Sequence, residues 1–348
     1  MANRISDRMV KAFERFNADL ETFRKETEGD GFESRQSTSM RIGLVDVDGS
    51  NFPNLALMKI SAWHKAKGDS VEWYEPMFSG HFDKVYLSKI FSFTPDFDYP
   101  IDADEVERGG SGYCISLVDG KEVFDKSKDK ELPYEVEHIY PDYSLYPELT
   151  KDTAYGFLTR GCPRGCDFCI VEKKEGRCSV KVADLSEFWR GQKKIVLCDP
   201  NILACKDWKG LLQQLIETRA EVDFNQGLDI RMMTEEKIEY LKQIKITQIH
   251  FAWDRYEDKD KVLPKLKLFA EKWGKKLSHN AIVYTIVNFS TIIEQDLERI
   301  YTLRDMGYWP YVMIYDKEHC KRVYKDLARW VNNRFIFASC KRFEDYKR

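Results

Sequence analysis

The chain has 348 residues, with 55 lysines and arginines against 58 aspartates and glutamates. This length exceeds what one hydrophobic core usually serves, so it favours two domains, or one barrel with an appendage. A hydrophobic content of 43% beside a charged content of 32% excludes global disorder. The net charge of −3 creates no overall field that would attract nucleic acid or an anionic membrane, so any such contact must be local.

The sequence contains no apolar run of the roughly 18 residues that a membrane helix needs, and its N-terminus lacks the apolar core of a secretory signal. We therefore expect a cytoplasmic protein that has no membrane partner. Nine cysteines are too sparse for a disulfide scaffold in a chain of this length. Three of them fall within eight positions, which indicates metal or redox chemistry.

The first predicted element is an amphipathic helix from Ile5 to about Glu28. Its large apolar residues are spaced by three or four positions, as one face of a helix requires, and they are Met9, Phe13, Phe16, Leu20 and Phe23. The seam is short for a coiled coil, so docking onto the body of the protein and dimerisation both stay open. Glycine, serine and threonine dominate residues 29–39, which predicts a linker and makes 1–39 the first unit.

A strand, a helix and two further strands are predicted next. They cover residues 42–45, about 53–67, 71–74 and 85–87. Strand, helix and strand at this spacing are typical of a doubly wound sheet, and the charge-rich stretch 119–137 marks its predicted end. We therefore predict a small doubly wound, flavodoxin-like α/β domain over residues 40–140.

From residue 153 the alternation of strands and helices resumes with longer units. Strands are predicted at 154–159, 194–198, 221–225, 248–253, 281–287 and 311–315. Apolar residues at helical spacing predict helices between them at 211–219, 235–243, 261–273 and 291–306. Six such units favour an α/β fold with a parallel sheet, which is either open or closed into a partial barrel.

Directly after the first of these six strands, three cysteines have the spacing CxxxCxxC; they are Cys162, Cys166 and Cys169. Three thiolates on one short loop can bind three irons of a [4Fe-4S] cluster and leave the fourth iron open to a substrate or cofactor. Two alternatives stay open. The loop could hold zinc with Cys178 or a histidine as a further ligand, or the three cysteines could be unrelated buried residues.

This spacing, with an aromatic residue before the last cysteine and six β/α units, resembles the radical S-adenosylmethionine superfamily over roughly residues 143–315. The resemblance implies a partial (β/α)6 barrel in which the three cysteines ligate a [4Fe-4S] cluster. It implies that the open iron binds S-adenosylmethionine, whose reductive cleavage yields a 5′-deoxyadenosyl radical. It further implies that Phe168 lies beside the adenine and that an electron donor such as a flavodoxin or ferredoxin reduces the cluster.

Further candidates for cofactor binding follow the second and third strands. Many members of the superfamily have a Gly-Gly-Glu-like motif after strand two that binds the amino group of S-adenosylmethionine, whereas this chain has Asp-Pro-Asn. An ammonium group needs hydrogen-bond acceptors, so Asp199 and Asn201 are the candidates there. Gln226, Asp229 and Arg231 are candidates for the carboxylate, the ribose or the substrate. The alternative for each is an ordinary polar loop residue.

A wound domain ahead of a radical module is similar to the cobalamin-binding subclass of this superfamily. That likeness implies cobalamin as a further cofactor. The DxHxxG motif of cobalamin domains is missing, since residues 46–49 read Asp-Val-Asp-Gly, so a cobalt ligated by histidine is not expected. Cobalamin bound without that histidine, and a fold retained without the cofactor, both stay open.

The C-terminal segment, residues 317–348, has ten lysines and arginines against four aspartates and glutamates, with six aromatic residues interleaved. Such a segment could bind a nucleic-acid backbone and stack on bases. The alternative is an amphipathic closing helix and a last strand with a solvated basic face. We predict a radical S-adenosylmethionine enzyme with a barrel over 141–316 and an unidentified substrate; the alternative is a non-catalytic iron–sulfur or zinc protein with a structural or sensing role.

Overall fold

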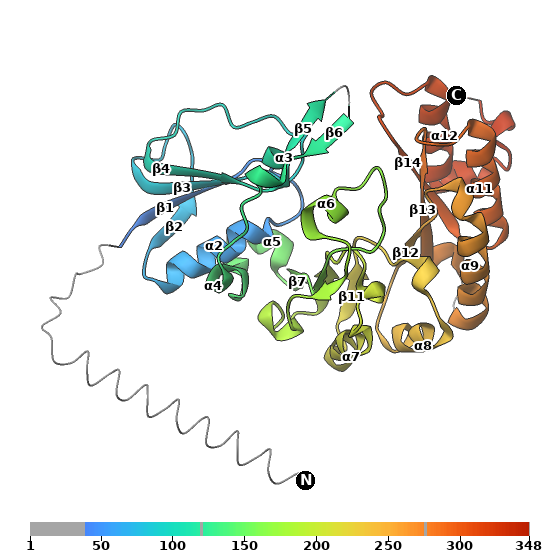
Figure 1. Cartoon of the computed structure of the whole chain (residues 1–348), viewed down its shortest axis with the longest axis horizontal. Coiled ribbons are helices and arrows are strands. Elements are labelled where there is room, and N and C mark those ends of the chain that lie inside the picture. The colour runs from blue at the N-terminus through green and yellow to red at the C-terminus, as the bar shows by residue number, and fades with distance from the viewer. Residues whose placement is uncertain (1–38, 119–120, 275–276, 348) are drawn as a thin grey trace, which may run out of the picture. The chain divides into compact units, whose positions relative to one another are not determined.

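The computed structural model describes residues 39–118, 121–274 and 277–347. The predicted N-terminal helix and nearly all of its linker lie outside these residues. The chain from Met40 to Arg348 forms one compact unit. Within it, strands and helices alternate along the chain, so the α/β class is confirmed (Figure 1).

The first half of this unit is built on a parallel sheet with the strand order β2-β1-β3-β4 (Figure 1). The strands and the helix between the first two are β1 (Arg41–Asp46), α2 (Leu55–Ala66), β2 (Ser70–Trp73), β3 (Phe82–Ser88) and β4 (Ala103–Gly109). Helix α2 begins where predicted because the Asn54 side chain accepts a hydrogen bond from the Leu57 amide, at 3.3 Å, and caps the first turn.

The two later crossovers of this sheet differ from a doubly wound domain. Residues 74–81 and 89–102 connect β2 to β3 and β3 to β4, and neither stretch contains a helix. Pro76 stands in the first connection, and Pro95 and Pro100 stand in the second. Proline removes a backbone donor and disfavours helical geometry in the residue before it, so these connections remain loops. The expected second layer of helices is therefore not supplied by these crossovers.

Short elements connect this sheet to the second half of the unit. They are α3 (Ser111–Cys114), the antiparallel hairpin of β5 (Ile115–Val118) and β6 (Lys121–Phe124), α4 (Tyr134–Glu137) and α5 (Pro147–Thr150). The charge-rich stretch predicted to close the wound domain, residues 119–137, contains β6 and α4 but not β5. The predicted boundary between residues 140 and 141 falls just after α4 and stays a prediction.

The second half contains six parallel strands in two sheets, with the orders β11-β10-β7 and β12-β13-β14. The strands are β7 (Thr153–Gly156), β10 (Lys194–Leu197), β11 (Glu221–Phe224), β12 (Ile249–Ala252), β13 (Ala281–Val287) and β14 (Trp309–Ile314). The long helices between them are α7 (Trp208–Thr218), α8 (Glu235–Gln243), α9 (Lys259–Trp273) and α11 (Ile293–Asp305). All six strands and all four helices lie within a few residues of their predicted positions.

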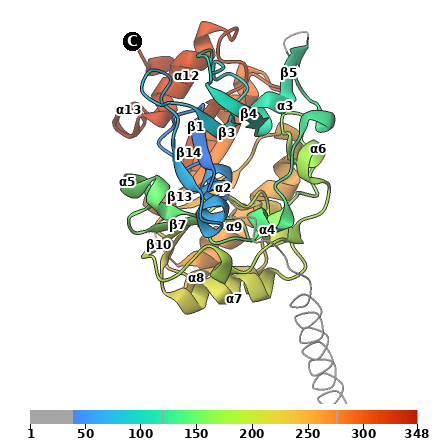
Figure 2. The same cartoon turned by 90° about the vertical axis from the view of Figure 1, so that its left-hand side faces the viewer.

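The largest core lies between these strands and helices α7, α8 and α9, of which α7 and α8 lie side by side (Figure 2). Strand β12 buries Phe251 and helix α9 buries Phe269, and their rings meet edge to face at 4.8 Å. The two sheets are connected after β11, where the Leu228 amide donates to the His250 carbonyl at 2.8 Å. This packing fixes the positions of the carboxyl ends of the strands, and therefore where the loops after them begin.

The basic C-terminal segment packs onto the second sheet. It forms α12 (Arg322–Asn332) and α13 (Arg334–Ser339), and in the described residues no strand follows β14. Trp330 and Phe337 are buried in a cluster with Val312 of β14 and Ile300 of α11. The predicted closing helix is confirmed and the predicted last strand is wrong, because Asn333 caps a second helix instead. Contact with nucleic acid stays a prediction. Of the aromatic side chains in this segment, Phe335 is 88% exposed and could stack on a base.

None of the helices in the described part of the chain combines the length and the apolar character that crossing a bilayer requires.

Candidate functional site

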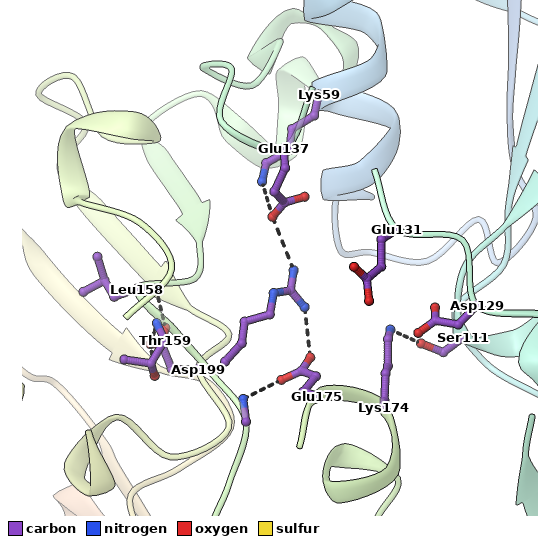
Figure 3. Close-up of polar contacts among 12 residues, drawn as sticks. Lys59, Ser111, Asp129, Glu131, Glu137, Leu158, Thr159, Lys174, Glu175 and Asp199 are labelled. Carbon is purple, nitrogen blue, oxygen red and sulfur yellow. Dashed lines mark hydrogen bonds and ion pairs between the residues drawn. The ribbon is translucent and has the colours of Figure 1, made fainter. Parts of the chain in front are cut away.

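The cysteine loop begins at a short strand that the sequence did not separate from its neighbour. The predicted strand 154–159 divides into β7 and β8 (Thr159–Arg160), and β8 pairs antiparallel with β9 (Val180–Lys181). The carboxylate of Asp199 makes this division, because it accepts hydrogen bonds from the amides of Leu158 and Thr159, at 3.1 and 2.5 Å, and from the Thr159 hydroxyl at 2.7 Å (Figure 3). Asp199 therefore supports the start of the loop.

The next two residues of the loop are held by helix α6 (Val171–Glu175). Glu175 accepts from the Arg160 guanidinium and from the Gly161 amide, both at 2.9 Å. Gly161 has φ of +83°, and a Cβ there would overlap the carbonyl oxygen of Cys178. Only glycine meets both demands without strain. The Cys162 amide then donates to the Gly176 carbonyl at 3.2 Å, so the first cysteine sits on a closed and braced turn.

A chain of charges joins this turn to the first half of the protein. Lys59 of α2 donates to Glu137 at 2.9 Å, and Arg160 lies 3.8 Å from the same carboxylate while bonded to Glu175 (Figure 3). Lys59 is largely buried, and this burial lowers its pKa although Glu137 opposes the shift. Partly buried charges that satisfy one another in this way hold the turn against helices α2 and α4 of the first half.

The three thiols of the loop lie within electrostatic range of one another. Burial raises the pKa of Cys166 to about 11; Arg231 opposes this rise, and Cys169, Asp254 and Cys162 add to it. Burial also raises the pKa of Cys169. Cys166 and Cys169 therefore carry their protons in the free protein and would release them on binding a metal, as metal–thiolate sites do.

In the described ranges, no three His, Cys, Asp or Glu side chains converge closely enough to hold a single metal ion. A [4Fe-4S] cluster sets a different requirement, because each thiolate binds a different iron of the cube. The three cysteines share one glycine-containing loop, and the cluster stays a prediction. Cys178, the further ligand considered for zinc, is exposed.

A buried polar network lies beside the loop and joins it to the residues after β10 and β11. Asn201, which is 2% exposed, has Nδ2 at 3.5 Å from Cys162 Sγ and at 3.3 Å from Asp229 Oδ2. Asp229 also accepts from Arg164 Nε at 2.7 Å and from Arg231 Nε at 2.8 Å. Burial favours the neutral acid, but the hydrogen bonds and charges of Arg231 and Arg164 hold the pKa of Asp229 below its usual value.

A pocket opens beside the second cysteine of the loop. Its wall includes Cys166, Phe168, Arg231, Asp254 and Asp258. Arg231 donates to Asp258 at 2.8 Å, and Asp254 accepts from the Ile286 amide at 3.3 Å. Burial raises the pKa of Asp254 to about 6. With Arg255 and Trp253 also in its wall, the pocket combines two arginines, two acids and two aromatic side chains next to a candidate cluster ligand.

Phe168 is positioned by aromatic residues that follow the last two strands. Its ring meets Phe289 edge to face at 5.4 Å, and Phe289 meets Tyr315 at 4.8 Å. These residues come after β13 and β14, so the cysteine loop reaches across to the second sheet. Phe168 also belongs to the pocket wall described above.

The predicted residues thus separate into two groups. The structure brings Asn201, Asp229, Arg231 and Phe168 to the cysteine loop. Asp199 is 4% exposed and uses both carboxylate oxygens to hold β8. Gln226 is exposed, and within the part of the chain described no hydrogen bond links it to the network.

The sequence did not lead us to select Arg164, Asp254 or Asp258 as cofactor-binding residues, although Asp254 is one of the polar residues at the predicted strand ends. Arg164 stands inside the cysteine motif, so its position was a signal that could have been used. Asp254 follows β12 as Asn201 follows β10, and the same rule about strand ends applies to it. Asp258 lies in a short turn before α9, and no sequence pattern points to it.

In comparisons with known proteins, no family model and no curated protein matches this chain.

Proposed function

We propose that this protein is a radical S-adenosylmethionine enzyme that acts on an unidentified substrate. The observation that carries the proposal is the position of the CxxxCxxC loop. Its second cysteine forms part of a pocket wall that also contains Arg231, Asp254 and Asp258. A cluster ligand beside a pocket with both signs of charge is what a site for a zwitterionic cofactor requires.

Cys162, Cys166 and Cys169 would hold the [4Fe-4S] cluster on the braced turn. When bound, the cluster supplies one electron to S-adenosylmethionine, which splits into methionine and a 5′-deoxyadenosyl radical that abstracts a hydrogen atom from the substrate. The protein contributes the geometry of the loop, which Glu175 and Asp199 maintain through backbone amides. Partial burial of the thiols also limits access of water to the ligands.

The polar side chains around the pocket match the parts of S-adenosylmethionine. Arg231 has donors left beyond those given to Asp229 and Asp258, and a guanidinium is suited to a carboxylate. Asn201 lies beside the cysteine loop and is not part of the pocket wall; its buried Oδ1 has no partner among the described residues and is the candidate acceptor for the amino group. Asp254 and Asp258 can accept from ribose hydroxyls. The ring of Phe168 offers a face for the adenine.

The partial barrel belongs to the same proposal. Two parallel three-stranded sheets that are joined between β11 and β12 support a (β/α)6 arrangement with the cysteine loop after its first strand. In such an arrangement the polar residues after β10, β11 and β12 share one edge with that loop. The contacts of Asn201 and Asp229 with the loop are consistent with this topology.

Reconstitution under anaerobic conditions tests the proposal. Wild-type protein should take up about four irons per chain, and under reduction it should convert S-adenosylmethionine to 5′-deoxyadenosine, measured by mass spectrometry. Cys166→Ala should lose both properties, while Cys320→Ala, outside the loop, should keep both. Iron uptake without any 5′-deoxyadenosine under several reductants would favour the non-catalytic alternative. One zinc ion per chain that depends on Cys178 would favour the zinc alternative.

Cobalamin binding stays a separate prediction for the first sheet. At the carboxyl edge of β1, Asp46 accepts from the Tyr146 hydroxyl at 2.7 Å and Asp48 accepts from the Ile90 amide at 2.5 Å. If cobalamin binds, protein that is mixed with hydroxocobalamin and then desalted should show the visible absorption of the cofactor. A colourless protein would remove cobalamin from the proposal and leave the radical chemistry untouched.

A further inference from the structure

The amide of Asn201 is placed to act on a cluster ligand. Its nitrogen lies between two acceptors, at 3.5 Å from Cys162 Sγ and at 3.3 Å from Asp229 Oδ2. A side-chain amide nitrogen carries two hydrogens, so it can donate one to each acceptor. Asn201 thereby connects the first cysteine of the loop to the buried Arg164–Asp229–Arg231 network.

The two acceptors also fix which way the amide faces. Thiolates and carboxylates only accept hydrogen bonds, so a rotated amide would turn its oxygen toward two electron-rich groups. Asp229 cannot turn away, because Arg164 and Arg231 hold its carboxylate at 2.7 and 2.8 Å. The nitrogen therefore faces Cys162 for a chemical reason.

The backbone of Asn201 is held as firmly as its side chain. Its carbonyl oxygen accepts from the hydroxyl of Ser179 at 2.8 Å, and both residues are buried. Ser179 directly precedes β9, the strand that pairs with β8 at the start of the cysteine loop. The donor and the sulfur are thus attached to the same hairpin, which keeps their separation constant.

We propose that Asn201 raises the reduction potential of the cluster by donating a hydrogen bond to the sulfur of Cys162. This inference rests on the proposed function, since it requires Cys162 to be a cluster ligand. A reduced cluster places more negative charge on its thiolates than an oxidised one. A donor at the sulfur therefore stabilises the reduced state more, and hydrogen bonds to cluster sulfurs are a recognised control of potential.

Two substitutions of Asn201 test this role. Asn201→Leu keeps the branched shape and removes the donor, and Asn201→Asp replaces the donor by a negative oxygen. Asn225→Leu is the matched control, because Asn225 follows the neighbouring strand and makes no hydrogen bond to a sulfur among the described residues. The midpoint potential is measured by redox titration followed by electron paramagnetic resonance, on reconstituted protein without S-adenosylmethionine.

We expect Asn201→Leu to shift the ratio of reduced to oxidised cluster about tenfold toward the oxidised form at a fixed potential. For one electron this equals a midpoint about 59 mV lower. Asn201→Asp should lower the potential further, and Asn225→Leu should leave it unchanged. Asn201 variants with a normal iron content and the wild-type potential would overturn the inference and leave the proposed function standing.

If the Asn201 variants fail to fold, a measurement on the wild-type protein still tests the inference. Wild-type protein labelled with ¹⁵N in the side chains of its asparagines should show a nitrogen coupling to the reduced cluster in pulsed electron paramagnetic resonance. Absence of that coupling would overturn the inference. Absence of any cluster in the wild-type protein is a different result, because it would overturn the proposed function itself.

Discussion

Arg164 and Asp229 form an ion pair with Nε and Oδ2 2.7 Å apart, although 65 positions separate them in the chain. Arg164 stands between the first and second cysteines of the motif, and Asp229 follows β11. The pair therefore ties the cysteine loop to the neighbouring strand. The Asp229 side chain is only 8% exposed and that of Arg164 is 31% exposed, so removing Arg164 would leave a largely buried carboxylate with one charged donor fewer.

Arg164→Met should destabilise the folded protein by about 1–3 kcal/mol, because a buried carboxylate loses one of its charged donors. The cluster should also be lost faster in the presence of a chelator. Arg177→Met is the control, since Arg177 is 70% exposed and pairs with Glu172 near the same loop. Water screens a pair at the surface, so Arg177→Met should change stability less than Arg164→Met. If Arg164→Met and Arg177→Met lower the free energy of unfolding equally, the Arg164–Asp229 pair contributes no more than a surface pair.

Glu175 should matter more than its neighbour Glu172 on the same helix. Glu175→Gln weakens the bonds to Arg160 and the Gly161 amide, and we expect a loss of about 1–2 kcal/mol in the free energy of unfolding. Glu172→Gln weakens only the pair with exposed Arg177, which water screens, so its effect on the free energy of unfolding should be smaller than that of Glu175→Gln. Urea unfolding and iron content measure both effects. A larger loss from Glu172→Gln would contradict the bracing role.

Gly161→Ala tests the close approach at the start of the loop. A side chain at positive φ costs about 1–2 kcal/mol, and at Gly161 the new Cβ must also displace the carbonyl of Cys178. Gly191→Ala separates the two causes, because Gly191 has φ of +98° and open space around it. We expect Gly161→Ala to lower the melting temperature more than Gly191→Ala and to reduce iron uptake. Identical melting temperatures for the two variants would show that the close approach of Gly161 to the Cys178 carbonyl does not affect stability.

Asp254 should make stability depend on pH in a defined direction. Burial raises the pKa of Asp254 to about 6, whereas an unfolded aspartate titrates near 3.9. The unfolded chain therefore releases this proton first, and the contribution of Asp254 to stability falls as pH rises from about 4 to about 6. Asp254→Asn removes this loss, so the stability of the variant relative to wild type should rise by about 3 kcal/mol over that window.

Urea unfolding of wild type and Asp254→Asn at pH 4, 5, 6 and 7 checks this expectation. The two stabilities should diverge below pH 6 and run parallel above it. A constant difference across the whole range would mean that Asp254 titrates at its ordinary value in the folded protein.

Much of this fold could be read from periodicity alone. Apolar residues at two-residue spacing mark strands, and those at three- or four-residue spacing mark helices, since burial of one face drives both patterns. The four long helices of the second half follow the helical pattern. Its six strands include alternating ones such as β11 and continuous apolar runs such as β10, which are typical of buried parallel strands. The cysteine spacing is equally local, because residues this close in sequence must share one loop. The crossovers at 74–81 and 89–102 are the exception, and their prolines explain it.

The choice between Asp199 and Asn201 could not be read in this way. Both are acceptors on one turn after β10, two positions apart, and either could serve an ammonium group. In the folded chain Asp199 turns toward the amides of Leu158 and Thr159, while Asn201 turns toward Cys162.

Local spacing settled which residues form strands, helices and the cysteine loop, because it depends on the order of neighbours along the chain. The partners of Asn201 and Asp229 lie tens of positions away, and Arg164, Asp254 and Asp258 entered the site for the same reason. Such contacts depend on which strands lie next to one another and how each loop turns. Burial then decides the rest, since a charged group inside the protein must find its partner there.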